Sequence, residues 1–230
     1  MRAVGVLGGM GPAATLDFMA KVLVADSAAR EQDKIRLIVD CNPGILDRNA
    51  AMRGEGPSPG PALAEMARGL VGAGAEVLVI ACNTAHAWIA DIAAAATVPV
   101  LSMIEAACEA IAADHPQAEH IGLLAGEGCL DAGLYQDAFA ARGWRPVIPP
   151  PNLQKDFTTA LYAVKAGSLG EAQKAAFIAC GAATWAAGAQ IVVAGCTEVP
   201  LLLTAADLPV ALVDPTEILA RRAVAFARGE

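Results

Sequence analysis

Three features are scarce in this chain of 230 residues: aromatic side chains, basic charge and closely spaced cysteine pairs. Aromatic residues make up only 4%, too few for a surface that stacks nucleic-acid bases. Lys and Arg total 16 against 24 Asp and Glu, and the charge of −8 argues against nucleic acid or an anionic membrane as partner. Without a Cys-x-x-Cys pair, the six cysteines indicate neither a zinc site nor dithiol redox chemistry.

Targeting and membrane signals are also missing. The chain begins with a strand-like run, residues 4–7, instead of the basic start and apolar stretch of a signal peptide. The longest uncharged run, residues 175–197, is interrupted by Gly181, Gly188 and Gly195, which favours a buried helix followed by a strand over a membrane span. We therefore expect a cytoplasmic protein with reduced thiols and no membrane partner.

The abundant residues indicate an α/β fold. Hydrophobic residues make up 56% of the chain, enough for a sizeable core. Short β-branched runs alternate with Ala-rich helical stretches, which is typical of parallel sheets covered by helices on both faces. A last helix is predicted from Thr216 to Arg228. The predicted strands are residues 4–7, 35–40, 77–81, 98–101, 121–125, 191–194 and 210–213.

Three motifs recur in the same order in the second half of the chain. Residues 5–11 resemble residues 122–128, residues 77–82 resemble 191–196, and residues 98–101 resemble 208–211. We infer two similar lobes related by a pseudo-twofold axis, with the active site between them. The predicted N-terminal lobe is residues 1–102, with a C-terminal helix in residues 214–230 packing on it. The predicted C-terminal lobe is residues 103–213.

Two cysteines occupy matching places in this repeat. Cys82 and Cys196 each end a predicted strand and precede a predicted helix, and their side chains are expected on opposite walls of one cleft. A helix N-terminus would lower the pKa of each thiol. Asn83 and Thr84 are good residues for the helix start. The alternative is that such a cysteine is only a small buried hydrophobe. The remaining four divide into two expected in the core, Cys108 and Cys180, and two candidates for the cleft wall, Cys41 and Cys129.

A pair of facing thiols suits the inversion of a stereocentre. One sulfur removes a proton from one face and the other delivers a proton to the opposite face, with the roles exchanged for the reverse reaction. This chemistry implies neither pyridoxal phosphate nor a metal ion, so we predict no cofactor.

The motifs that carry these residues resemble the aspartate/glutamate racemase superfamily over nearly the whole chain, and most closely its cofactor-independent aspartate racemases. The glycine loop is unspecific alone, whereas the two cysteine motifs together are highly specific. The matching segments are Gly8-Gly-Met-Gly-Pro-Ala-Ala-Thr15, Asn42-Pro-Gly-Ile-Leu-Asp-Arg48, Cys82-Asn-Thr-Ala-His86, Tyr162-Ala-Val-Lys-Ala-Gly167, Gly195-Cys-Thr-Glu-Val-Pro200 and Asp214-Pro-Thr216.

The resemblance implies a homodimer that acts on a small amino acid, with Cys82 and Cys196 as catalytic acid and base. It implies that Arg48 binds the side-chain carboxylate and that Lys165 lies close to the substrate. The groups expected to hold the α-carboxylate are Asn83, Thr84, Thr197 and backbone N–H groups near Met10 and Gly11.

Each of these residues also has a structural interpretation. An arginine suits bidentate binding of a carboxylate, and the alternative is that Arg48 is an exposed loop cation paired with Asp47. Lys165 precedes Ala-Gly and fits an ordinary helix end. We place His86 and Glu198 behind the direct substrate contacts. His86 either tunes Cys82 or only packs, and Glu198 either orients the cleft or only caps a first turn.

Two loops depart from the family pattern. The second-lobe loop, usually Ala-Thr-x-Gly-Thr, has Gly126 and Cys129 in place of both threonines. The arginine loop, usually Ile-Pro-Asp-Arg-Thr, ends in Asn49. A hydroxyl is therefore missing near the expected α-carboxylate, and the pocket around Gly126 is open to being larger or differently hydrated. These departures bear on substrate identity more than on mechanism.

The preferred prediction is PLP-independent racemisation of an acidic amino acid, L-aspartate to D-aspartate, with glutamate or a broader range of amino acids as the alternative. Decarboxylases and cis–trans isomerases of related fold also remain within the superfamily. A nucleotide-binding oxidoreductase is a rival because Gly9, Gly11 and Ala14 fit a dinucleotide fingerprint and Asp40 ends the next strand. A non-catalytic binding protein of the same shape is another. The loops at residues 54–61 and 146–151 are either lids or ordinary connections.

Overall fold

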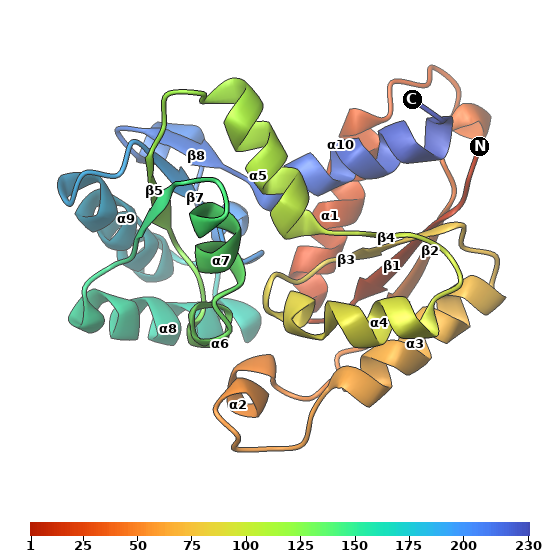
Figure 1. Cartoon of the computed structure of the whole chain (residues 1–230), viewed down its shortest axis with the longest axis horizontal. Coiled ribbons are helices and arrows are strands. Elements are labelled where there is room, and N and C mark those ends of the chain that lie inside the picture. The colour runs from red at the N-terminus through yellow and green to blue at the C-terminus, as the bar shows by residue number, and fades with distance from the viewer.

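The computed structural model describes all 230 residues and contains two four-stranded parallel sheets (Figure 1). The first sheet has the order β2-β1-β3-β4, and the second has the order β6-β5-β7-β8. The equivalent strand order confirms the predicted pair of similar α/β lobes. The strands are β1 (Val4–Gly8), β2 (Leu37–Cys41), β3 (Val77–Ile80), β4 (Val100–Leu101), β5 (His120–Leu123), β6 (Arg145–Val147), β7 (Ile191–Val193) and β8 (Ala211–Val213).

Helices connect the strands and cover both faces of each sheet. They are α1 (Pro12–Ala25), α2 (Arg48–Met52), α3 (Gly60–Gly72), α4 (Ile89–Ala95), α5 (Met103–Asp114), α6 (Glu127–Asp131), α7 (Leu134–Ala140), α8 (Pro151–Lys165), α9 (Glu171–Ala186) and α10 (Pro215–Arg228). Short 3₁₀ turns complete the chain: η1 (Glu31–Asp33), η2 (Thr84–Trp88), η3 (Val199–Leu201) and η4 (Ala205–Asp207). None of the helices combines the length and the apolar character needed to cross a bilayer.

One strand escaped the sequence prediction. Residues 145–147 form β6 beside β5 at the edge of the second sheet, although Pro146 lies in the strand and the segment reads as a loop. A proline cannot donate a ladder hydrogen bond, and an edge strand tolerates it because one side of the strand has no partner. Residue 151 begins α8, so the proline-rich segment is a strand and a helix start.

Each sheet lies between two layers of helices (Figure 1). The first sheet has α1 and α10 on one face and α3 and α4 on the other. The second sheet has α5 and α7 on one face and α8 and α9 on the other. Successive side chains of β1 and β3 enter opposite cores, since strand side chains alternate between faces. This burial on both faces explains the continuous apolar runs in the sequence.

The last helix returns from the second sheet to the first. Helix α10 begins at Pro215, directly after β8, and packs against α1 through Leu219, Ala223 and Ala227. Its N-cap residue, Asp214, accepts hydrogen bonds from the backbone of Thr216 and Glu217. The chain therefore crosses between the sheets twice. The lobe boundary between residues 102 and 103 stays a prediction.

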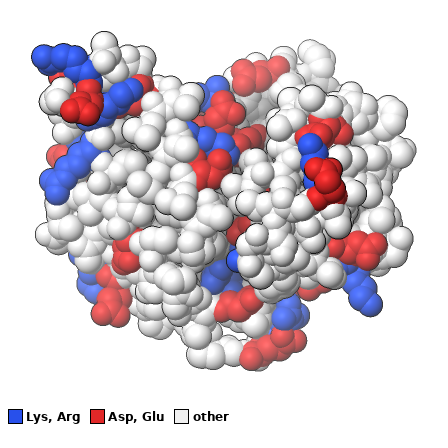
Figure 2. Space-filling model, turned by 180° about the vertical axis from the view of Figure 1, so that it is seen from behind, with Lys and Arg blue, Asp and Glu red and all other residues white.

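Charged side chains are dispersed over the surface. Figure 2 shows basic residues mostly beside acidic ones on the face it presents, separated by wide uncharged areas. The ion pairs of the protein include Arg53 with Glu55 and Arg142 with Glu105. The face drawn has no continuous basic patch of the kind that binds polyanions.

Helix α10 is held at its C-terminal end by one buried carboxylate. Asp26, which is 2% exposed, accepts a hydrogen bond from the backbone of Ile35 and pairs with the guanidinium of Arg228. Burial alone would raise the pKa of Asp26, but the Ile35 N–H and Arg228 together bring it below its ordinary value. We expect Arg228→Ala to destabilise the chain by roughly 2 to 3 kcal/mol, because it leaves that carboxylate without its charged partner.

Urea unfolding measures this loss. Arg221→Ala is the control on the same helix, because Arg221 is exposed and its ion pair with Glu217 is long, at 3.9 Å. It should change the unfolding free energy by less than about 0.5 kcal/mol. Equal effects of the two substitutions would contradict the assigned role of Arg228.

Candidate active site

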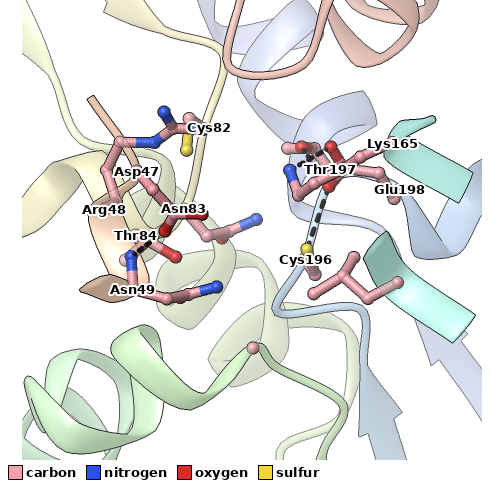
Figure 3. Close-up of a pocket in the computed structure, with 12 residues that line it drawn as sticks. Asp47, Arg48, Asn49, Cys82, Asn83, Thr84, Lys165, Cys196, Thr197 and Glu198 are labelled. Atoms are coloured by element: carbon pink, nitrogen blue, oxygen red, sulfur yellow. Dashed lines mark hydrogen bonds and ion pairs between the residues drawn. The ribbon is translucent and has the colours of Figure 1, made fainter. Parts of the chain in front are cut away.

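A pocket lies between the two sheets, and its lining comes from both. Cys82 and its neighbours follow β3, and Cys196 and its neighbours follow β7. The start of α2, the end of α8 and the residue before α6 supply the remaining walls. The carboxyl ends of parallel strands share one edge of a sheet, so two facing sheets bring both strand ends to one space. The lining residues are Asp47, Arg48, Asn49, Cys82, Asn83, Thr84, Gly126, Leu161, Lys165, Cys196, Thr197 and Glu198 (Figure 3).

The two cysteines stand on opposite walls of this pocket, as the repeat predicts (Figure 3). Cys82 is 5% exposed and Cys196 is 8% exposed. The expected α-helices after them are wrong. Short 3₁₀ turns, η2 and η3, follow instead, and Asn83 makes no side-chain cap. A single 3₁₀ turn offers a much weaker aligned dipole than a helix, so neither sulfur has the expected helix N-terminus beside it.

Cys196 has a carboxylate neighbour. Its thiol donates a hydrogen bond to Oε2 of Glu198 over 3.0 Å, and Glu198 is 2% exposed. Burial raises the pKa of Cys196 well above its ordinary value, and the negative charge of Glu198 raises it further, while the charge of Lys165 opposes both. The prediction of a lowered pKa is therefore wrong for Cys196. In the substrate-free protein this side chain is a thiol.

Lys165 balances the charge of Glu198. Its Nζ lies 2.5 Å from Glu198 Oε1 and also donates to the carbonyl oxygen of Met10 over 3.2 Å. Burial lowers the pKa of Lys165, but the charge of Glu198 and the hydrogen bond to it outweigh burial and raise it. The lysine is therefore a permanent cation at the end of α8, where it lines the pocket.

Arg48 begins α2 and is only half-buried. It makes no ion pair with Asp47, whose carboxylate instead caps the helix by accepting from the backbone of Asn49 and Ala50. The guanidinium donates to three backbone carbonyls, those of Ile45, Leu46 and Met10. These bonds hold the arginine beside the pocket, and Nε and one N–H of Nη2 stay free to bind a ligand.

Met10 and Gly11 lie next to the pocket without lining it. The carbonyl of Met10 accepts from both Arg48 and Lys165, so the loop presents an acceptor to the two cations. A Cβ at Gly11 would lie 3.3 Å from Glu198 Oε1, which places this glycine against the carboxylate. The expected backbone N–H contacts from this loop to a ligand remain a prediction.

The polar residues predicted to face the substrate do line the pocket: Asn83, Thr84 and Thr197 are all buried there. The hydroxyl of Thr197 donates to Glu198 over 3.2 Å. His86, in contrast, lies behind Cys82. The prediction that Glu198 lies behind the direct contacts is wrong, because Glu198 lines the pocket itself.

Sequence reasoning missed Asp47, Asn49 and Leu161 as pocket residues. Asn49 crosses between the sheets: its Oδ1 accepts from the backbone of Gly128 over 3.0 Å, and its Nδ2 donates to the Tyr162 hydroxyl over 3.0 Å. The sequence signal for this role was Asn49 itself, which stands where the family pattern has a threonine. A Cβ at Gly126 would lie 3.2 Å from Leu161 and 3.6 Å from Asn49, so these two side chains occupy the space that a larger pocket would need.

The other cysteines separate as follows. Cys108 and Cys180 are buried in the core, as predicted, and burial raises the pKa of each to about 11. The placement of Cys41 and Cys129 on the cleft wall is wrong, because Cys41 is exposed at the end of β2 and Cys129 is fully buried in the second core. Neither lines the pocket.

Packing explains the glycine in the first loop without a bound nucleotide. Gly9 has φ +89°, and a Cβ there would lie 2.3 Å from the backbone nitrogen of Asn42. The backbone N–H of Gly9 donates to Thr15, so it is not available to a phosphate. Close approach of two loops therefore accounts for the glycine, and the dinucleotide interpretation loses its main support.

The profile of the Asp/Glu/Hydantoin racemase family matches residues 7–223. This chain belongs to that family. It is therefore an isomerase of the racemase class, which excludes the oxidoreductase alternative.

Similar solved structures cover the whole fold. An aspartate racemase of Picrophilus torridus superposes with a TM-score of 0.88 at 23% identity, covering 99% of this chain and 95% of its own. A putative Asp/Glu racemase of Yersinia pestis has a TM-score of 0.81 at 26% identity, covering 99% and 100%. A glutamate racemase of Francisella tularensis, solved with D-glutamate, has a TM-score of 0.69 at 18% identity, covering 99% and 82%.

In this racemase-family chain His86 supports the backbone around Cys82. Its Nδ1 lies 2.9 Å from the carbonyl oxygen of Cys82, and its Nε2 accepts from the backbone N–H of Met103 over 3.0 Å. These partners require a neutral ring with the proton on Nδ1. Burial lowers the pKa of His86 to about 4. The packing interpretation therefore describes His86 better than tuning of the sulfur.

This buried neutral histidine makes stability depend on pH. Between the ordinary pKa of 6.5 and about 4, the unfolded chain takes up a proton that the folded chain does not, so stability falls as pH falls. We expect the difference in unfolding free energy between wild type and His86→Asn to shrink by roughly 2 to 3 kcal/mol from pH 7 to pH 4.5. Ile92→Val, which removes a buried methyl group and no titratable group, should give a constant difference. A constant difference for His86→Asn too would count against the neutral ring.

Proposed function

We propose that this enzyme racemises an acidic amino acid, with aspartate as the first candidate, by passing protons between Cys82 and Cys196 without pyridoxal phosphate. The observation that carries the proposal is the placement of two buried cysteines, from equivalent positions after β3 and β7, on opposite walls of one pocket. A substrate between them presents its α-carbon to a sulfur on each face. Removal of the proton by one sulfur and delivery by the other inverts the centre.

The protonation of Cys196 gives the two sulfurs different starting roles. Because Cys196 begins as a thiol, it is the proton donor of the substrate-free enzyme, and Cys82 must act as the thiolate base for that direction. After one turnover the proton has moved from Cys196 to Cys82 through the substrate. The reverse direction starts from that second state, so each state serves one enantiomer.

The charges of the pocket favour an acidic substrate. Glu198 balances the charge of Lys165, so Arg48 is the lining cation with free N–H groups, and these suit a side-chain carboxylate. Asn83, Thr84 and Thr197 supply short polar groups for the α-carboxylate. The likeness to an aspartate racemase supports aspartate, while glutamate or a broader range is the alternative.

The oligomeric state, the location, the cofactor requirement and the lobe boundaries are proposed as the sequence predicts them. We propose a homodimer in the cytoplasm that needs no metal or organic cofactor. We keep the lobes as residues 1–102 with 214–230, and residues 103–213.

The proposal is tested by incubating each aspartate enantiomer in D₂O without pyridoxal phosphate. The α-proton should exchange and the opposite enantiomer should appear. Cys82→Ser and Cys196→Ser should each lower racemisation by about 10²- to 10⁴-fold, since a serine hydroxyl is a far weaker acid at neutral pH. Each single variant can still exchange the enantiomer whose proton faces the remaining cysteine. Cys108→Ser, in the core, is the control for loss of a thiol.

Full activity in both serine variants would contradict the two-base mechanism. A higher kcat/KM for glutamate than for aspartate would make glutamate the preferred substrate and leave the proposed mechanism unchanged. No exchange with aspartate, glutamate or related acids would remove the proposal altogether.

The pH profile tests the assigned role of Glu198. Glu198→Gln keeps the shape of the side chain but removes the charge that raises the pKa of Cys196, so that pKa should fall. In the direction where Cys196 donates, the alkaline limb of kcat/KM should move to lower pH by about one unit or more, and in the reverse direction the acid limb should move the same way. Glu217→Gln on exposed α10 is the matched control. Unchanged limbs in both directions would contradict the coupling.

A further inference from the structure

Tyr135 is the largest fully buried side chain of the protein, and its hydroxyl reaches the other lobe. It lies on α7 and donates a hydrogen bond over 2.6 Å to Oδ1 of Asn83, which follows β3. A buried phenol needs a hydrogen-bond partner, and the partner of this one is a residue that lines the pocket. The link therefore connects the core of one lobe with the candidate site on the other.

The other end of the Asn83 amide has no partner in the protein. Asn83 is 2% exposed, and its Nδ2 makes no hydrogen bond. The side chain extends into the space between Cys82 and Cys196 (Figure 3). A buried amide donor without an acceptor is costly, so a ligand acceptor at this point gains a strong binding contact.

We propose that Tyr135 is a positioning residue for substrate binding: its hydroxyl fixes the Asn83 amide so that the NH₂ group points at the substrate carboxylate. This rests on the proposed function for the identity of the ligand. The two ends of an asparagine amide have nearly the same shape and opposite polarity, so packing alone does not choose between them. A carboxylate only accepts hydrogen bonds, and the reversed amide would turn an oxygen toward it.

Two features of the core keep Tyr135 suited to this task. Burial raises the pKa of Tyr135 well above its ordinary value, so the hydroxyl keeps its proton. The hydroxyl donates only to Asn83 Oδ1, and a reversed amide would leave that buried proton without an acceptor. The ring packs against Phe139, with centroids 5.6 Å apart, which limits its rotation. Because Asn83 adjoins Cys82, a fixed amide also fixes the carboxylate relative to one reacting sulfur.

Steady-state kinetics with aspartate test the role of the hydroxyl. Tyr135→Phe should raise KM about five- to tenfold while kcat changes by less than twofold, since the variant loses orientation of a binding group. Asn83→Ala should raise KM at least as much. The double variant should match Asn83→Ala alone, because Tyr135 acts through Asn83. Thr184→Val removes a fully buried hydroxyl of α9, which does not line the pocket, and should leave KM unchanged.

A second measurement needs neither substrate nor a variant that folds less well. In the wild-type protein labelled with ¹⁵N, the side-chain amide protons of Asn83 should show no strong nuclear Overhauser effect to the Tyr135 ring, because the oxygen faces the phenol. Addition of succinate, a dicarboxylate that cannot racemise, should shift those amide resonances.

Three results would overturn the role of Tyr135: a strong Overhauser effect between these groups, an unchanged KM in Tyr135→Phe, or KM effects that multiply in the double variant. Failure of the proposed function is a different result, namely no α-proton exchange by the wild type with any acidic amino acid. The orientation of the Asn83 amide is then still decided by the spectrum of the substrate-free protein.

Discussion

The buried ion pair between Lys165 and Glu198 is the interaction on which the candidate site depends. A carboxylate that is 2% exposed would be strongly destabilising without a cation, and Lys165 supplies that cation from the end of α8. The second oxygen of Glu198 is then free to accept from Cys196 and Thr197. Lys165 also reaches the Met10 carbonyl on the other lobe, so the same cation joins the two walls of the pocket.

This pair also makes the two cysteines unequal. Cys82 and Cys196 follow equivalent strands of two similar sheets, so the repeat alone would give them equal surroundings. Only Cys196 has a carboxylate within hydrogen-bond distance. Two residues after Cys82 the chain has Thr84, where the second lobe has Glu198, and His86 is turned to backbone groups and stays neutral. Duplication therefore sets the positions of the sulfurs, and the few residues after each strand set their chemistry.

The sequence predicts the features that follow from a local pattern of residues. The predictions fail where contacts between distant residues determine the structure. Apolar runs predict seven of the eight strands, and the repeat predicts that Cys82 and Cys196 face one pocket. Strand β6 was missed because Pro146 is tolerated only at an edge, and edge position is a property of the assembled sheet. The predicted direction of the Cys196 pKa is wrong because burial raises this pKa, the carboxylate of Glu198 lies beside the sulfur, and a 3₁₀ turn stands where a helix was expected.

The two departures from the family pattern complement each other across the pocket. Gly126 on one lobe leaves room beside Leu161, and Asn49 on the other lobe reaches into that region. A Cβ at Gly128 would lie 2.6 Å from Asn49 Oδ1, so this glycine lets α2 approach α6 closely enough for the backbone hydrogen bond. An amide from one lobe thus stands near the place where a family threonine hydroxyl would come from the other. Because Asn49 bonds to Gly128 and Tyr162, a ligand that held the lobes apart would break both bonds, and the distance between the lobes becomes part of the selection for a small substrate.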